Sequence, residues 1–273
     1  MNDPLNSHFL RRVFPVLGAV WVIVLLSRPM LRAATEEDTA IERGREVYIA
    51  EGCINCHSQY IRPNVATDVE RWGPATVLPA RSEAEPPLFG NRRQGPDLSN
   101  VGLRRSPVWN RLHLIAPRSI SPGSVMPAYA HLFRPGDEHG PDLLAYLSSL
   151  GSERAMARSE FVSRWQPVGL HPDVVAPNDR LFLRLCATCH GPTGRGDGVL
   201  ARQLEPAPPD WTKGARHIAA SGEGQLLFLC RLIKFGLPGT AMAGHEYLSD
   251  DEIAGLACFV QGQQSNTAPS ASR

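Results

Sequence analysis

The sequence C-x-x-C-H occurs twice in this 273-residue chain, as Cys53-x-x-Cys56-His57 and as Cys186-x-x-Cys189-His190. In such a motif the two thiols bond the vinyl groups of a haem and the imidazole holds its iron. Zinc is the main alternative, because paired cysteines are common zinc ligands. Each motif ends in histidine and is followed by a methionine, which zinc rarely uses and which iron in c-type cytochromes accepts. The motifs therefore predict two covalently bound haem c groups.

Beyond the N-terminal segment the sequence contains only three methionines, Met126, Met156 and Met242. Met156 falls between the expected domains, so Met126 and Met242 are the expected second axial ligands, opposite His57 and His190. A histidine-methionine pair fills both axial positions of an iron, which favours electron transfer over catalysis. The alternative sixth ligands are His113, His131, His217 and His245.

An uncharged and mostly apolar run, residues 13–27, lies near the N-terminus. It is short for a hydrocarbon core of roughly 30 Å, although flanking arginine stems can extend such a span. A cleaved secretory signal is the competing interpretation, but Arg28, Pro29 and Arg32 crowd the region where a cleavage site needs small residues. We expect residues 1–34 to be an uncleaved single-pass anchor in the inner membrane. C-type haem is attached outside the cytoplasm, so the haem domains should face the periplasm.

Periodic apolar residues predict the helices that position these ligands. In the first domain the expected helices cover residues 39–51 and 142–150, and residues 58–96 are expected to be a long loop. In the second domain they cover 179–185, 225–235 and 249–260, the last starting with a capping box of Ser249 and Glu252. The order helix, C-x-x-C-H, loops, methionine, helix is thus repeated. We predict an all-α fold with two class I-like cytochrome c domains in tandem after one transmembrane helix: anchor 1–34, first domain 35–150, linker 151–172, second domain 173–262 and tail 263–273.

Two further cysteines, Cys230 and Cys258, fall on the last two predicted helices of the second domain. A disulfide is possible in an oxidising compartment, provided that the helices bring the two α-carbons within about 7 Å. The alternative is a pair of buried thiols that pack as small apolar residues. The sequence leaves both open.

The first domain resembles the membrane-anchored cytochrome c subunit (subunit II) of C-family, cbb-three-type haem-copper oxidases. The matching segments, in order along the chain, are residues 48–59 around the haem motif, 61–63, 69–73, 95–98 (Gly-Pro-Asp-Leu) and 126–129 (Met-Pro-Ala-Tyr). Trp109 and His113 also stand where that family has a tryptophan and a histidine. Residues 173–262 are similar to class I cytochrome c domains in general. The fused second haem domain departs from the usual single-haem pattern of the subunit.

The resemblance implies a respiratory electron carrier that is not an enzyme by itself but belongs to an oxidoreductase complex. Its expected partners are a haem-copper oxidase core subunit as acceptor and a cytochrome c or a quinol-oxidising complex as donor. A cytochrome subunit of a nitric oxide reductase and a freestanding dihaem carrier are the alternatives, and a dihaem peroxidase is a more distant one. The net charge of +1 gives no reason to expect nucleic acid as a partner.

Overall fold

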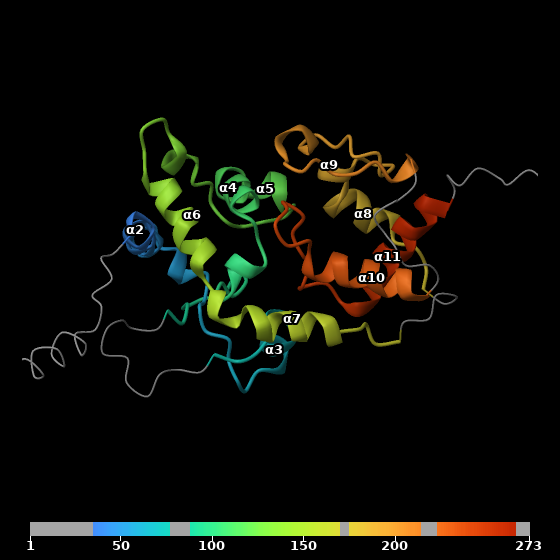
Figure 1. Ribbon diagram of the computed structural model, residues 1–273, viewed down its shortest axis with the longest axis horizontal. Coiled ribbons are helices and arrows are strands. Elements are labelled where there is room, and N and C mark those ends of the chain that lie inside the picture. The colour runs from blue at the N-terminus through green and yellow to red at the C-terminus, as the bar shows by residue number, and fades with distance from the viewer. Residues whose placement is uncertain (1–34, 77–87, 170–174, 214–222, 266–273) are drawn as a thin grey trace, which may run out of the picture. The chain divides into compact units, whose positions relative to one another are not determined.

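The computed structural model describes residues 35–76, 88–169, 175–213 and 223–265 (Figure 1). The chain divides into two compact units, residues 1–39 and 40–273. Of the first unit only residues 35–39 are described, so the account below concerns the second. The expected anchor lies outside the described residues, as does most of the expected tail. No helix in the described ranges has the length and apolar character needed to cross a membrane.

The first haem domain is built around the crossing of helices α2 (Glu36–Ala50) and α6 (His139–Ser149). Gly44 makes the close approach possible, because a Cβ at this position would overlap the backbone carbonyl of Asp142. The same Asp142 accepts two hydrogen bonds from the Arg43 guanidinium, at 2.6 and 2.8 Å. The rings of Tyr48 and Tyr146 meet beneath this pair with centroids 5.7 Å apart. Both predicted helices are confirmed, and their crossing lies at Gly44 and Asp142.

Several short helices of this domain were not predicted from the sequence. Helix α3 (Ala66–Trp72) interrupts the segment 58–96, which was expected to be a loop throughout, and α4 (Pro107–Ile115) and α5 (Pro117–Ile120) follow it. Helix α4 has clear start signals, since the Ser106 hydroxyl accepts from the Trp109 amide at 3.2 Å and Pro107 occupies the first turn. Periodicity alone misses such helices because they are too short to show it.

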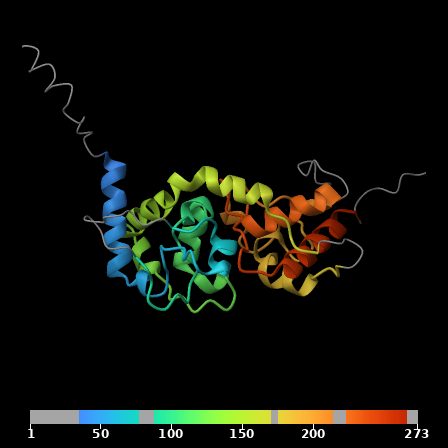
Figure 2. The same cartoon turned by 90° about the horizontal axis from the view of Figure 1, so that it is seen from below.

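The segment 151–172, expected to be a linker with weak periodicity, contains a helix that was not predicted. Gly151, in the left-handed region with φ of 91°, lies just after α6, and a 3-10 turn, Ser152–Arg154, leads from it into α7 (Ala155–Arg164). Helix α7 and the residue after it pack on the second haem domain: the rings of Phe161 and Trp165 both meet Phe235 edge-on, at 5.7 and 5.3 Å. In Figure 1 the end of α7 lies next to α10, and Figure 2 shows the same yellow-green helix from below.

The second haem domain consists of α8 (Asp179–Leu185), α9 (Ala187–His190), α10 (Glu223–Phe235) and α11 (Asp250–Ser265). The three helices predicted here are confirmed within a few residues. So is the capping box, in which the Ser249 amide donates to Glu252 Oε2 at 3.0 Å and the Glu252 amide donates to Ser249 Oγ at 3.2 Å. The described residues contain no strand, only one isolated bridge between Gly236 and Ala243.

Helices α10 and α11 carry the two additional cysteines, and both are free thiols. Cys230 is fully buried in the second core. Burial, with a smaller contribution from the charge of Cys258, raises the pKa of Cys230 to about 12. Of the two alternatives the structure therefore has the packed thiols rather than the disulfide.

Candidate functional site: two haem-attachment centres

The first C-x-x-C-H motif begins directly after α2. Gly52 adopts the left-handed conformation with φ of 72°, which turns the chain into the single 3-10 turn Cys53–Asn55. The His57 amide donates to the Cys53 carbonyl at 2.9 Å, so the two ends of the motif lie together. Burial raises the pKa of the Cys53 thiol to about 11. Cys53 faces the core of the domain, whereas Cys56 is half-buried.

The His57 ring is fixed by the Gly-Pro segment of the same domain. Its Nδ1 lies 2.9 Å from the Pro96 carbonyl oxygen, and because a carbonyl can only accept, Nδ1 carries the proton. That leaves Nε2 with a free lone pair for a metal, the arrangement usual for a metal-binding histidine. A Cβ at Gly95 would overlap the imidazole, so only glycine allows this close contact. Burial lowers the pKa of His57, and the Pro96 contact opposes this shift.

Met126 lies against the same core as the first motif. The core contains Cys53, and Met126 and Tyr129 pack on it as partly buried side chains. The loop is held at its base, where the Tyr129 amide donates to the Leu114 carbonyl at 2.8 Å. The structure thus brings Met126 and the motif to one core, and the role of Met126 as an iron ligand stays a prediction.

The second motif lies at the junction of α8 and α9. The His190 amide donates to the Cys186 carbonyl at 2.9 Å, which repeats the backbone pattern of the first motif. The His190 ring stacks on Trp211 with centroids 4.6 Å apart. Its Nδ1 is buried without a hydrogen-bond partner among the described residues, and burial lowers the pKa of the ring to about 4. A neutral, buried imidazole is the form that binds iron.

The two methionine loops share one local device. The Met126 amide donates to the Ser124 hydroxyl at 3.2 Å, and the Met242 amide donates to the Thr240 hydroxyl at 3.1 Å. In each case a hydroxyl two residues earlier fixes the backbone that carries the sulfur. Met242 is half-buried, and its carbonyl accepts from the Leu237 amide at 3.0 Å. The repeat supports equivalent roles for the two methionines.

The alternative histidine ligands differ from one another. His131 lies near the surface and contacts Glu51 at 3.2 Å, and His217 lies outside the described residues. His113 stacks on Trp109 at 4.6 Å, and burial, followed by the proximity of His57, lowers its pKa to about 4. Burial also lowers the pKa of His245 to about 4.

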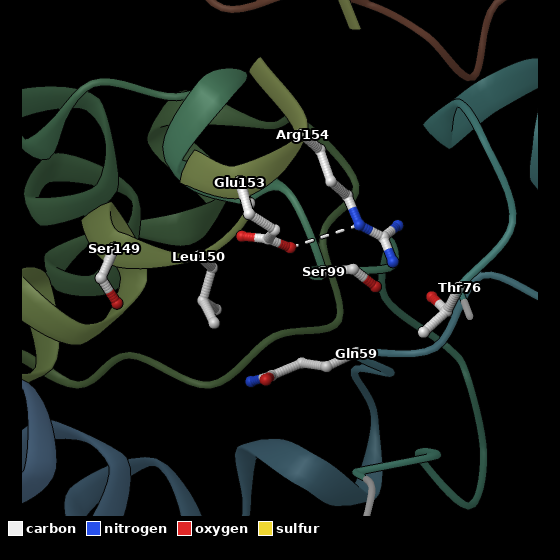
Figure 3. A pocket seen from close by; sticks show the side chains of 8 residues that line it. Gln59, Thr76, Ser99, Ser149, Leu150, Glu153 and Arg154 are labelled. Atoms are coloured by element: carbon white, nitrogen blue, oxygen red, sulfur yellow. Dashed lines mark ion pairs between the residues drawn. The ribbon is translucent and has the colours of Figure 1, made fainter. Parts of the chain in front are cut away.

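One pocket of the first domain is lined by residues outside the motifs (Figure 3). It holds about 300 Å³ and is lined mainly by polar side chains, among them Gln59, Ser99, Glu153 and Arg154. The dashed line marks the ion pair of Arg154 with Glu153, at 3.3 Å. Neither the motif residues nor the two methionines line it, so it is not part of the haem site. The described residues also contain no group of three or more His, Cys, Asp or Glu placed to hold a metal ion.

Some residues of this region were missed at the level of sequence. A buried carboxylate, Glu246, lies just beyond the Met242 loop and is surrounded by Arg104, Arg105 and Arg158. The adjacent pair Arg104-Arg105, shortly after the Gly-Pro-Asp-Leu segment, was the only available signal. Nothing in the sequence marks Glu246 or Arg158 as its partners.

Comparison with known families gives two matches. Residues 28–153 match the family described as cytochrome c oxidase, mono-heme subunit/FixO, and residues 176–264 match the cytochrome c family. No curated protein matches the chain. Among solved structures, a chain of the reducing HAO-like protein complex of Kuenenia stuttgartiensis is 20% identical, with 85% of this chain and 97% of that chain covered and a TM-score of 0.27.

The two family matches agree with the geometry of the two motifs. Each contains one C-x-x-C-H sequence at the end of a helix, a half-buried histidine and a methionine loop held by a hydroxyl. Residues 28–153 therefore form a FixO-type, cbb-three oxidase subunit domain, and a second cytochrome c domain follows it. Both domains are of kinds that bind haem c covalently and serve as electron-transfer subunits.

Proposed function

We propose that this chain is a membrane-anchored dihaem relay that passes electrons from a donor outside the cytoplasm to the core subunit of a haem-copper oxidase. The observation that carries this proposal is the FixO-type match of residues 28–153, in a chain that continues into a second complete C-x-x-C-H domain. The family is described as mono-haem, so the second domain adds a second carrier to the usual one.

Each domain would hold its haem with its own residues. The thiols of Cys53 and Cys56, and of Cys186 and Cys189 in the second domain, would attach the porphyrins. A c-type haem supplies an iron that takes up and releases one electron. His57 presents Nε2 because Pro96 occupies its Nδ1. Met126 and Met242 would complete the coordination of the irons bound by His57 and His190.

The direction of flow follows from the tether. Residues 1–34 would anchor the chain in the inner membrane, with the haem domains in the periplasm, because haem c is attached outside the cytoplasm. The first domain follows the anchor directly and would deliver electrons to the oxidase core. The second domain would receive them from a cytochrome c or a quinol-oxidising complex.

The test uses the purified full-length chain with both haems and a haem-copper oxidase core from which its own cytochrome subunits have been removed. With a chemically reduced cytochrome c as donor, adding the chain should restore oxygen uptake. A chain that becomes reduced by the donor but produces no oxygen uptake would contradict the proposal.

The same assay separates the alternatives. Restored consumption of nitric oxide with a nitric oxide reductase core, but not of oxygen with the oxidase core, would favour the reductase subunit. Peroxide reduction by the chain alone would favour a peroxidase, which needs one iron with an exchangeable position.

A further inference from the structure

Glu246 is the most deeply buried acidic side chain among the described residues of the second haem domain. Its side chain is 0% exposed, and it follows Met242 by four residues. Arg105 donates to its Oε2 at 2.9 Å, and Arg158 to its Oε1 at 3.4 Å, while Arg104 lies 3.9 Å from Oε1. These arginines are themselves 9%, 7% and 1% exposed. One carboxylate thus joins three guanidinium groups from two parts of the chain, the adjacent pair Arg104-Arg105 and Arg158 on α7.

Arg104 connects this cluster to the segment behind His57. It donates through Nε to Asn100 Oδ1 at 2.6 Å and through Nη2 to the Asp97 carbonyl. Asp97 directly follows Pro96, whose carbonyl accepts from His57. The position of Arg104 is therefore tied to the backbone that orients the first iron-binding histidine.

Arg105 connects the cluster to the second methionine loop. Its Nη2 donates at 2.8 Å to the carbonyl of Gly244, two residues after Met242, and its Nη1 donates at 2.8 Å to the Arg104 carbonyl. Its guanidinium also lies 5.0 Å from the centre of the Trp109 ring, which stacks on His113. One side chain thus contacts the backbone of both haem domains.

Arg158 adds helix α7 to the same cluster. Its guanidinium lies 5.6 Å from the centre of the Phe235 ring, at the end of α10. All four charged groups are buried, so separating them is costly in free energy: a guanidinium or a carboxylate parted from its partners here would remain buried and unpaired. Burial alone would raise the pKa of Glu246, but Arg105 and Arg104 outweigh it and lower the pKa to about 2.

We propose that Glu246, with Arg105 and Arg158, forms a clamp that docks the two haem domains in the arrangement through which electrons pass between them. The proposal rests on the proposed relay function. Electron tunnelling falls steeply with distance, so a relay within one chain requires its carriers to stay at a fixed separation. The clamp joins the Pro96–Arg104 segment, which holds His57, to the Met242–Glu246 segment, which begins at the expected ligand of the second iron. The distance between these two segments sets the distance between the two haems. Glu246 is thus a positioning residue.

The test compares four variants of the full-length dihaem protein. Glu246→Gln removes the carboxylate charge and keeps the shape, and Arg158→Gln removes one partner while leaving two. Arg105→Lys keeps the charge but replaces the planar guanidinium, whose two terminal nitrogens reach Glu246, Gly244 and the Arg104 carbonyl, with a single ammonium nitrogen. Arg164→Gln is the matched control, because Arg164 is on α7 as well but pairs with Glu160 at the surface.

Two measurements are made on each variant. Nitroxide labels on cysteines introduced at the exposed positions Glu138 and Val199 report the distance between the domains by pulsed electron paramagnetic resonance. Rapid photoreduction of one haem, followed by electron equilibration with the other, gives the transfer rate. The reduction potentials and the methionine-to-iron absorption band of each haem are recorded alongside.

In the unaltered protein and in Arg164→Gln we expect one narrow distance distribution. In Glu246→Gln and Arg158→Gln it should broaden and the transfer rate should fall, with the docking equilibrium weakened by roughly tenfold or more. Potentials and absorption bands should not change. Arg105→Lys should keep a mostly narrow distance distribution and most of the transfer rate, because the positive charge is retained.

Two results would overturn the clamp. One is a narrow distribution and an unchanged rate in both charge-removing variants, even if their melting temperatures fall, since Glu246 would then serve stability alone. The other is loss of the Met242 absorption band, which would mean that Glu246 acts on the ligand loop. If the unaltered protein shows a narrow distribution of label distances but no electron transfer between the haems, the proposed relay function is contradicted instead.

Discussion

His57 and His190 occupy the same place in their motifs, but their rings are held differently. The Nδ1 of His57 donates to a backbone carbonyl, whereas His190 is held by stacking on Trp211. A hydrogen bond at Nδ1 fixes the ring orientation and raises the basicity of the other nitrogen toward a metal. The two irons would therefore have non-equivalent proximal ligands.

The methionine assignment can be tested one residue at a time. Met126→Ala and Met242→Ala should each remove half of the sulfur-to-iron absorption at the red end of the oxidised spectrum, because each deletes one thioether ligand. Met156→Ala is the control, since Met156 is 87% exposed on α7. Spectra that remain unchanged in both ligand variants would refute the assignment and turn attention to His113 and His245.

At the scale of elements, the crossing of α2 and α6 depends on one missing side chain. Gly44→Ala should destabilise the first domain by roughly 1–3 kcal/mol, because the new methyl group overlaps the Asp142 backbone, even though alanine favours helix. Gly262→Ala, on α11, is the opposite control: a Cβ there meets nothing within 4 Å, so a gain of up to about 1 kcal/mol is expected. Thermal unfolding of both variants checks the pair. A Gly44→Ala variant as stable as the parent would show that the two helices can accommodate a methyl group at their crossing.

The sequence predicts the helices that have clear periodicity or caps, and it predicts the attachment motifs. Ser249 and Glu252, for example, form the expected reciprocal hydrogen bonds. It fails where a helix is short, as in α3, or where a segment with weak periodicity gains its stability from partners far along the chain. Helix α7 is of the second kind, because the contacts of Phe161 with Phe235 and of Arg158 with Glu246 cannot be read locally.

At the scale of the whole molecule, the retention of the N-terminal segment is open to a direct measurement. Intact mass spectrometry of the membrane fraction should give the full chain plus two haems, because Arg28, Pro29 and Arg32 make a poor cleavage region. A mature chain beginning at Ala34 or Thr35 and recovered in the soluble fraction would refute the anchor. The haem content from the same spectrum tests the count of two independently of the anchor.

The packing of α7 also has a consequence for how such a chain can arise or be taken apart. Because Trp165 and Phe161 cover Phe235, and the Arg231 Nε donates to the Trp165 carbonyl at 2.8 Å, the helix is a lid on the second domain although it precedes its haem motif. A gene fusion that appended only residues from 175 onward would have left the apolar surface around Phe235 exposed to solvent. A module that could be exchanged between proteins therefore starts near Ala155, 21 residues before the match to the cytochrome c family begins at residue 176.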